Sequence, residues 1–447
     1  MMKHIILLIS LILFVKNSVQ IQNVQIIGTD FERHDKNYNL NIVQNEKKKC
    51  GNYEILNLDN MNLRFIKNDM IQSNYIQHIS LYKNNLENIY TILDNVPNLS
   101  CLNLSHNEIN IYNGNVIRHL HLKTLDLSYQ KISEVKDLEA DINEVYNYVI
   151  FNSTGMILPD LQYLDLSGND ISALMWNFNV SFPQLKQLDL ININADILEP
   201  MFFDKIPRSL RVLHLENNHI YNLTLQNMAE VTALYLDGNS YLQIINIVSK
   251  KLKILSLSNC ANLIEGHGIF DVPYLEQLDL SMNNFETVST ISFTAFPSLR
   301  ILLMDYNKLP EIPLLNELPK LNELSLNFNR IKYIRSDIFA YFPSLKKLSL
   351  RGNKIVHIDK DSFFGLNSLE YLNLSENKLK ALPYNWAVSL INLQYLNVNS
   401  NQLTNILNVA IRNIGSLQYL SVKNNLFTKV TTAELAYLPN ATTVYIA

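Results

Sequence analysis

Glycine and cysteine are scarce in this chain of 447 residues, which holds 11 glycines and 3 cysteines. So little glycine leaves few candidates for a phosphate-binding loop, and no Walker loop is present. The Gly-x-Ser-x-Gly motif of serine hydrolases, the His-Glu-x-x-His motif of zinc proteases and paired Cys-x-x-Cys sites are also absent. The sequence therefore predicts no catalytic residues, no metal site and no cofactor, and a protein that is not an enzyme.

Charge and long apolar runs are also limited. Only 17% of the residues are charged and the formal net charge is −4, which argues against a general affinity for nucleic acid. No run of eighteen apolar residues is present, so no membrane span is expected. By contrast, 47% of the residues are hydrophobic, which is ample for a folded core.

The first twenty residues have the pattern of a secretory signal peptide. Lys3 precedes an apolar run at residues 5–15, and a short polar stretch at residues 16–20 follows. An apolar run of this length is too short to cross a bilayer, and its order of charge, apolar core and polar end is typical of a cleaved signal. We expect cleavage near Gln20 and a secreted protein, or a cell-surface protein if a C-terminal continuation carries an anchor.

One pattern, Leu-x-Leu-x-x-Asn, recurs along the chain. Counting conservative variants, about 17 copies occur at intervals that are mostly 21 to 25 residues, and the interval is 24 from Leu324 onward. Leu-x-Leu forms a short strand whose two leucines point inward. The asparagine at the following bend can hydrogen-bond the backbone of neighbouring turns. Because one repeat cannot bury its apolar edge, the copies must stack, and the sequence predicts an α/β solenoid with a parallel sheet of about 17 strands.

This pattern resembles the signature of the leucine-rich repeat family, L-x-x-L-x-L-x-x-N/C-x-L, over nearly all of residues 50–447. A second pattern, with phenylalanine, follows the strands in residues 292–299, 338–345 and 362–369. Repeats of 24 residues with this phenylalanine resemble the typical animal extracellular subfamily, which includes Toll-like receptor ectodomains, chaoptin and insect leucine-rich immune proteins. The resemblance implies a horseshoe with the sheet on its concave face and a mostly irregular or short-helical convex side.

The regular array suggests a division into three parts: a signal peptide at 1–20, a capping segment at 21–50 and repeats at 51–447. An insertion at about residues 134–156 has helical spacing and is expected to be a short helix, either a binding protrusion or a tolerated loop. Gln130 and Ile193 replace the asparagine, so irregular turns are expected there. Val444 lies 24 residues after Leu420 and predicts a last, truncated repeat, as in a fragment of a longer protein.

Each of the three cysteines has its own context. Cys260 occupies the asparagine position of its repeat and is expected to be a buried thiol. Cys101 and Cys50 would lie about 10 Å apart, beyond disulfide reach unless the capping segment folds back. Whether they pair with each other, or with another chain, stays open.

Seven Asn-x-Ser/Thr sequons are candidate glycosylation sites: Asn98, Asn103, Asn152, Asn179, Asn222, Asn373 and Asn440. Asn103 and Asn373 fall within Leu-x-Leu. Glycans there would shield the sheet, but the repeat consensus also produces such sequons by chance.

The outward strand positions supply the candidate partner-binding residues. They are acidic in the first part of the array, at Asp126, Asp165, Asp189, Glu216, Asp237, Asp279 and Asp305, and aromatic or basic later, at Lys347, Arg351, Tyr371, Tyr395, Tyr419 and Lys423. The three tyrosines share one register and should stack as an exposed ladder with a spacing of roughly 5 Å. Exposed tyrosines beside cations make good interface anchors. The alternative is ordinary consensus variation on a solvated surface.

These features favour a secreted or cell-surface, non-enzymatic scaffold that binds an extracellular protein ligand or co-receptor, in innate immune recognition or cell adhesion. Homo- or hetero-oligomers are compatible with it. Two alternatives are a fragment of a Toll-like receptor ectodomain and a structural matrix or adhesion component that self-associates through its repeats. Neither the ligand nor the biological process follows from the sequence.

Overall fold

The fold was obtained as a computed structural model. It describes residues 25–26, 55–66, 71–89, 93–111, 117–131, 156–171, 178–195, 205–226, 230–261, 269–288, 291, 293–315, 318–411, 414–436, 438 and 442–446. The predicted signal peptide, the helix expected at 134–156 apart from Met156, and the capping segment apart from residues 25–26 lie outside these ranges. Among the described residues, no helix combines the length and hydrophobicity needed to span a bilayer.

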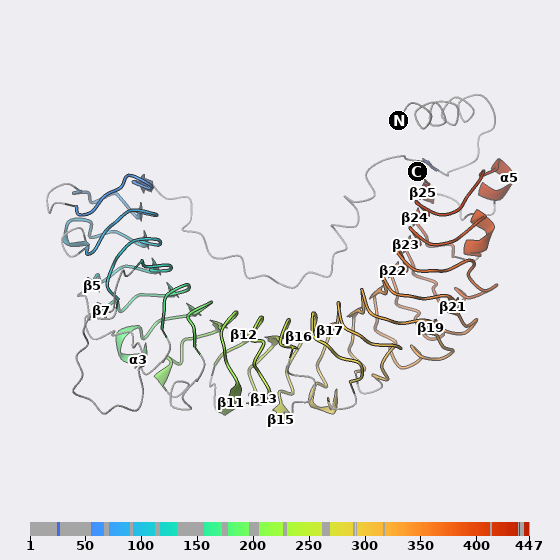
Figure 1. Ribbon diagram of the computed structural model, residues 1–447, viewed down its shortest axis with the longest axis horizontal. Coiled ribbons are helices and arrows are strands. Elements are labelled where there is room, and N and C mark those ends of the chain that lie inside the picture. Colours follow the sequence, from blue (N-terminus) through green and yellow to red (C-terminus); the bar gives the residue numbers. More distant parts are fainter. Residues whose placement is uncertain are drawn as a thin grey trace. The chain divides into compact units, whose positions relative to one another are not determined.

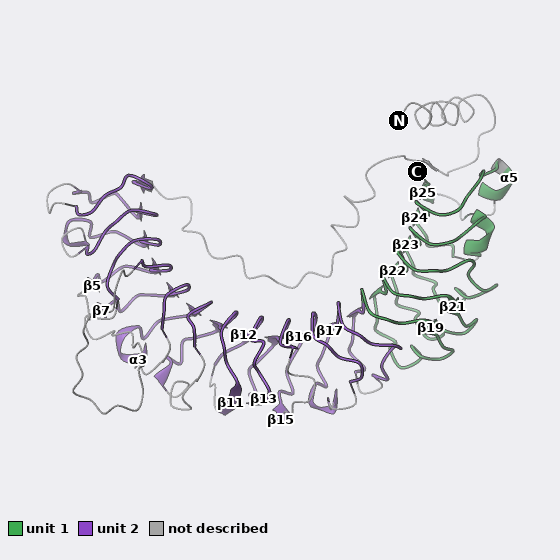
Figure 2. Ribbon diagram, in the orientation of Figure 1, with its two compact units in different colours: residues 1–40, 327–447 green, residues 41–326 purple. Residues whose placement is uncertain are grey.

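The chain forms two compact units (Figure 2). Unit 1 contains residues 1–40 and 327–447, and unit 2 contains residues 41–326. Each unit is a stack of repeats in which every repeat contributes one short strand to a parallel sheet (Figure 1). The predicted solenoid of about 17 parallel strands is confirmed.

Unit 2 holds the larger part of the sheet. Its strands, in spatial order, are β2 (Ile55–Asn57), β3 (His78–Ser80), β4 (Cys101–Asn103), β6 (Thr124–Asp126), β8 (Tyr163–Asp165), β9 (Gln187–Asp189), β10 (Val212–His214), β12 (Ala233–Tyr235), β14 (Ile254–Ser256), β16 (Gln277–Asp279), β17 (Ile301–Leu303) and β18 (Glu323–Ser325). Leucine pairs with leucine across these strands, as Leu102 does with Leu125. Both are almost fully buried, so the repeat spacing sets the register and the core together.

Unit 1 continues the same pattern with β20 (Lys347–Ser349), β22 (Tyr371–Asn373), β23 (Tyr395–Asn397), β24 (Tyr419–Ser421) and β25 (Thr443–Tyr445). Leu420 pairs with Val444, as the 24-residue interval predicts. The two-residue strand β1 (Gln25–Ile26) pairs in parallel with β25.

Short elements form the side of the repeats opposite the main sheet. Small parallel sheets join β11 (Asn222–Gln226), β13 (Ile244–Val248) and β15 (Ile269–Asp271), join β5 (Ile117–Arg118) and β7 (Met156–Ile157), and join β19 (Tyr333–Ile334) and β21 (His357–Ile358). The helices are single turns: η1 (Leu93–Asn95), α3 (Phe178–Ser181), η3 (Phe293–Ala295), η4 (Ile406–Val409) and α5 (Thr432–Leu435). The phenylalanines of the predicted pattern are buried here except for Phe364, which is 60% exposed, and the rings of Phe339 and Phe363 stack at 5.8 Å between centroids.

The repeat asparagines hydrogen-bond neighbouring turns as predicted. Asn107 Nδ2 donates to the carbonyl oxygens of Leu81 and Leu104, both at 2.9 Å, and its Oδ1 accepts the Leu86 N–H at 3.0 Å. The same pair of carbonyl bonds recurs at Asn84, Asn169, Asn218, Asn239, Asn283, Asn307, Asn377, Asn401 and Asn425. Each amide thus satisfies backbone groups that the bend leaves without a partner.

The expected irregularity at Gln130 is not found. Its Nε2 donates to the Leu104 carbonyl at 2.9 Å and its Oε1 accepts the Ile109 N–H at 3.0 Å, so the longer side chain makes the bonds between repeats that asparagine makes elsewhere. Cys260 makes one of these bonds to the preceding repeat, with Sγ 3.4 Å from the Leu236 carbonyl oxygen. At Ile193 no amide is available, and the Leu190 carbonyl receives its side-chain donor from Asn218 of the next repeat.

The residue before each asparagine position has a positive φ. Gly168 (φ +69) shows why glycine is used at one of these bends, because a Cβ there would lie 2.3 Å from the Tyr129 ring. Non-glycine residues hold the same conformation at other bends, including Tyr129, Asn217, Met282, Tyr306 and Phe328. The bend therefore imposes a strained conformation on ordinary side chains, which the stacking of repeats must hold in place.

Candidate binding surfaces

The tyrosine ladder exists, but most of it is buried. Tyr371, Tyr395 and Tyr419 pair in one register on neighbouring strands, and the first two rings stack at 4.6 Å with an interplanar angle of 13°. Tyr395 is 0% exposed, Tyr371 is 4% exposed and Tyr419 is half-buried. The prediction of three exposed rings is therefore wrong, because aromatic rings in one register cover one another and pack with Tyr445 in a single cluster.

The cations predicted beside this ladder make contacts within the fold. Arg351 bonds Glu376 Oε1 through Nε at 2.9 Å and Nη2 at 2.7 Å, and its guanidinium lies 5.5 Å from the Phe328 ring centroid. Lys423 Nζ lies 5.8 Å from the Tyr445 ring centroid. Lys347 is half-buried on β20. Their role as partner-binding residues stays a prediction.

Several residues of the predicted acidic stripe have a local structural role. Asp126 Oδ1 accepts the Ser128 N–H at 3.0 Å, and Asp165 Oδ1 accepts the Ser167 N–H at 2.9 Å. Asparagine makes the same bond two residues onward at Asn103, Asn373 and Asn397. The motif Leu-Asp-Leu-Ser thus forms an Asx turn that ends the strand. This local bond is by itself a reason for aspartate at the outward position, and no binding protein is needed to explain it.

Asp189 differs from these aspartates because its bonds come from side chains. The Tyr163 hydroxyl donates to Asp189 Oδ2 at 2.7 Å, and Gln187 Nε2 donates to Oδ1 at 3.0 Å. Burial raises the pKa of Asp189, the nearby His214 opposes this, and Asp165 on the adjacent strand raises the pKa further. Burial, together with the carboxylates of Asp189 and Asp165, also raises the pKa of Tyr163.

His214 and Glu216 lie beside Asp189 on the open face of the unit 2 sheet. His214 Nδ1 bonds Glu216 Oε1 at 2.7 Å, and the imidazole stacks on the Tyr235 ring at 4.5 Å. Burial alone would lower the pKa of His214, but the hydrogen bond and charge of Glu216, with Asp189, raise it overall. Glu216 Oε2 is buried and has no hydrogen-bond partner among the residues that the structure describes, although the Glu216 side chain as a whole is 15% exposed.

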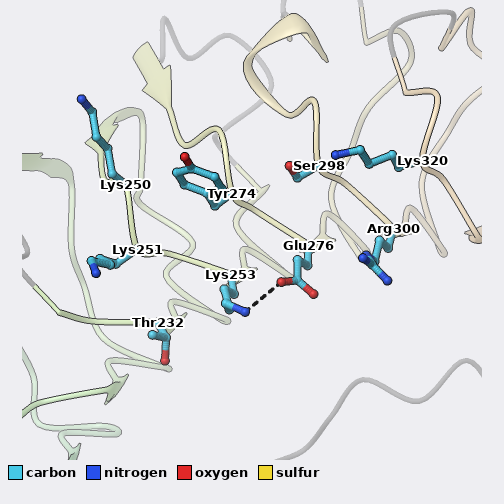
Figure 3. Close-up of a pocket in the computed structure, with 9 residues that line it drawn as sticks. All are labelled: Thr232, Lys250, Lys251, Lys253, Tyr274, Glu276, Ser298, Arg300 and Lys320. Atoms are coloured by element: carbon cyan, nitrogen blue, oxygen red, sulfur yellow. Dashed lines mark ion pairs between the residues drawn. The ribbon is translucent and has the colours of Figure 1, made fainter.

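A basic hollow lies at the edge where the strands of unit 2 begin (Figure 3). Its lining includes Lys250, Lys251, Lys253, Arg300 and Lys320 together with Glu276. We did not predict it from the sequence, where the signal is a basic residue two positions before the first leucine of Leu-x-Leu, as at Lys253 and Arg300.

The sequons differ in accessibility. Asn98, Asn179 and Asn222 are exposed and Asn103 is half-buried. Asn373 is 4% exposed, with Nδ2 donating to the Tyr371 hydroxyl at 3.2 Å and Oδ1 accepting from Ser375. Asn152 and Asn440 lie outside the described residues.

The cysteines take two states. Cys260 is a free, buried thiol, and burial raises its pKa to about 12. Cys101 is disulfide-bonded. Cys50 lies outside the described residues.

Comparisons with known proteins agree with this architecture. Models described as leucine-rich repeat match residues 250–309, 319–379 and 158–173. Lumican of Coturnix japonica is 34% identical over 290 residues, which cover 62% of this chain and 76% of that protein. Podocan of Mus musculus is 26% identical over 239 residues, covering 47% of this chain and 38% of podocan. The chain belongs to the leucine-rich repeat family.

Two solved structures resemble the fold. One is TLR13 in its complex with ssRNA13, with a TM-score of 0.54 and 19% identity over 83% of this chain and 60% of TLR13. The other is a leucine-rich repeat protein of Leptospira interrogans, with a TM-score of 0.50 and 22% identity over 83% of this chain and 96% of that one. At these identities the likeness concerns the fold alone.

Proposed function

We propose that this protein is a non-enzymatic extracellular scaffold that binds a protein partner through the open face of the unit 2 sheet. The observation that carries the proposal is the Oε2 atom of Glu216, which is buried and finds no donor within the described part of the chain. Buried carboxylate oxygens without a donor are unfavourable by about 1–3 kcal/mol or more, so a structure that keeps one is suited to receive a donor from outside.

The surroundings of Glu216 define the donor. The carboxylates of Asp189 and Asp237 lie in the neighbouring repeats, and burial raises the pKa of both groups. A lysine ammonium or arginine guanidinium from a partner would satisfy Glu216 Oε2 and offset this accumulated negative charge. Tyr235 is 5% exposed, and its ring stacks on His214, which holds the imidazole that bonds Glu216 in place.

The extracellular setting is supported by two independent observations. The first twenty residues have the order of a secretory signal. Lumican, podocan and osteomodulin, relatives of this chain, are extracellular matrix proteins. These relatives favour a matrix or adhesion role as a second candidate function of this chain, beside innate immune recognition.

The binding proposal is tested with the secreted full chain on an array of extracellular protein domains, and with an oligo-arginine peptide in isothermal titration. Glu216→Gln keeps the shape but removes the charge, and it should weaken binding of the peptide, and of any array partner, at least tenfold. Glu286→Gln, at an exposed position of the same unit, is the matched control and should bind as wild type. Equal affinity of wild type and Glu216→Gln for every partner would refute the proposal.

Secretion is tested separately by expressing the full chain in animal cells. The medium should contain a glycosylated protein whose N-terminus begins near residue 21. Recovery of the chain from the cell lysate alone, unglycosylated and with Met1 retained, would refute an extracellular function.

A further inference from the structure

The basic hollow of unit 2 has a volume of about 590 Å³ and an uneven charge balance. Five of its lining residues are cationic and Glu276 supplies the carboxylate. Lys253 Nζ pairs with Glu276 Oε1 at 2.9 Å, as Figure 3 shows, so the carboxylate is already engaged. A chain of net charge −4 thus gathers a local excess of positive charge at one site.

Three of these cations are available to a ligand. Lys250, Lys251 and Arg300 are exposed, and none of them forms an ion pair within the part of the chain that the structure describes. Lys250 and Lys251 follow β13, whereas Arg300 directly precedes β17. Cations from different repeats therefore meet at one hollow only because the solenoid stacks them.

The backbone beneath the hollow is held firmly. The Lys253 carbonyl accepts the N–H groups of Glu276 and Gln277 at 2.8 and 2.9 Å, and the Glu276 carbonyl accepts those of Arg300 and Ile301 at 2.8 and 3.0 Å. Side chains in this register thus start from fixed points about one strand spacing apart, roughly 4.8 Å. The two cations of this register, Lys253 and Arg300, flank Glu276 and thus start about two strand spacings apart, roughly 10 Å, which suits a ligand with repeated anionic groups better than a single ion.

The charge continues along the same edge of the sheet. Arg211 and Lys186 occupy the equivalent position before β10 and β9. Arg211 lies 3.9 Å from Glu230, with both side chains partly exposed, and its Nη1 also donates to the carbonyl oxygens of Arg208 and Leu210. Within the described ranges, Lys186 Nζ donates to the neutral Gln162. The cations at this position, Lys186, Arg211, Lys253 and Arg300, therefore form a track along the edge, with Thr232 and Glu276 between them, which a linear polyanion can follow.

We propose that this hollow and the track beside it bind a linear sulfated polysaccharide. Sulfate groups would accept hydrogen bonds from Lys250, Lys251 and Arg300. Tyr274, which lines the hollow and is 57% exposed, offers a flat surface to the apolar face of a sugar ring. Among the lining residues Tyr274 is the sole aromatic side chain, whereas single-stranded nucleic acid is held by a succession of aromatic platforms.

This site lies on the edge of the sheet and shares no residue with the His214–Glu216 region, so it is independent of the proposed protein partner. The test uses heparin, chemically desulfated heparin and a single-stranded oligonucleotide of matched length. Binding of each to the full chain is measured by isothermal titration at several salt concentrations. The test variant is Lys250→Gln/Lys251→Gln/Arg300→Gln, and the matched control is Lys332→Gln/Lys354→Gln/Lys360→Gln, at exposed lysines of unit 1.

Heparin should bind the wild type and the control equally, and the test variant at least tenfold more weakly, with a salt dependence that is shallower by about two to three units on the log–log scale. Desulfated heparin should bind far more weakly than heparin. Thermal unfolding must coincide for the three proteins, because the substituted side chains are exposed. The proposal is overturned if both triple variants weaken heparin equally, if desulfation has no effect, or if the oligonucleotide binds more tightly than heparin.

Discussion

Asn377 joins two repeats of unit 1 through its side-chain amide, with Nδ2 2.9 Å from the carbonyl oxygen of Leu350 and 3.1 Å from that of Leu374. Its Oδ1 accepts the Ile355 N–H at 3.0 Å. Replacement by alanine removes the acceptor of the Ile355 N–H, while the Leu350 and Leu374 carbonyls keep the bonds that they accept from Asn353 and Asn401.

We therefore expect Asn377→Ala to lower the free energy of unfolding by about 2 kcal/mol, measured by urea denaturation followed by circular dichroism. Asn392→Ala is the control, because Asn392 is exposed and its side-chain amide donates a hydrogen bond to the Asn367 carbonyl. It should change stability by less than about 1 kcal/mol. Equal effects of the two substitutions would contradict a buried bridging role for Asn377.

Tyr395 is a core residue, and its truncation should act on folding. Because the ring is fully buried between Tyr371 and Tyr419, Tyr395→Ala should lower the free energy of unfolding by about 3–5 kcal/mol. Tyr384→Ala, at a side chain that is 81% exposed, should have little effect. A Tyr395→Ala protein as stable as wild type would restore the ladder as a candidate partner surface.

Asp279 should make the stability depend on pH. Burial raises its pKa to about 6 from the ordinary 3.8, so the folded state favours the neutral acid. The contribution of this group to stability is full below pH 3.8 and is lost as the pH rises through 6, a change of about 3 kcal/mol.

Asp279→Asn keeps an oxygen that can accept the Ser281 N–H but cannot ionise. It should therefore be more stable than wild type at pH 7.5, by up to about 3 kcal/mol, and nearly equal to it at pH 4. Asp361→Asn, at an exposed carboxylate, should show no such dependence. Unfolding curves at the two pH values decide the matter, and a gain at pH 4 as large as that at pH 7.5 would exclude the ionisation argument.

Glycan occupancy should follow accessibility. In protein secreted from animal cells, Asn98→Gln, Asn179→Gln and Asn222→Gln should each remove the mass of one glycan, since these side chains are exposed. Asn373→Gln should leave the glycan mass unchanged, because Asn373 Nδ2 is buried against the Tyr371 hydroxyl. Intact mass spectrometry distinguishes these cases, and a glycan on Asn373 would show that the strand end opens in the cell.

The register of the array could be predicted because every repeat has leucine and asparagine at the same spacing. Leucine at fixed spacing places the strand, and asparagine three residues after the second leucine satisfies the bend, so Leu420 and Val444 are paired as the interval requires. At Gln130 this spacing pattern led to a wrong prediction. The sequence indicated a departure there, whereas the longer amide reaches the same carbonyl.

Side-chain exposure on the open face was decided by neighbours from other repeats. The strand pattern places Tyr371 and Tyr395 at outward positions, yet each ring is covered by the tyrosine ring on the next strand. Asp126 and Asp165 look like a charged surface, yet each bonds the backbone two residues onward. The alternation of inward and outward side chains along a single strand predicts neither contact.

The sequence by itself determined the solenoid, its strands, its core and the asparagine bonds, because all of these arise from contacts within a repeat or between repeats of the same pattern. Only the tertiary structure decided which polar groups are buried and which charges gather at one site. Within the described residues Glu216 Oε2 has no donor, because the stacked repeats bury it, and the basic hollow exists because side chains from several repeats meet at one edge. These properties depend on distances between side chains that the repeat spacing does not specify.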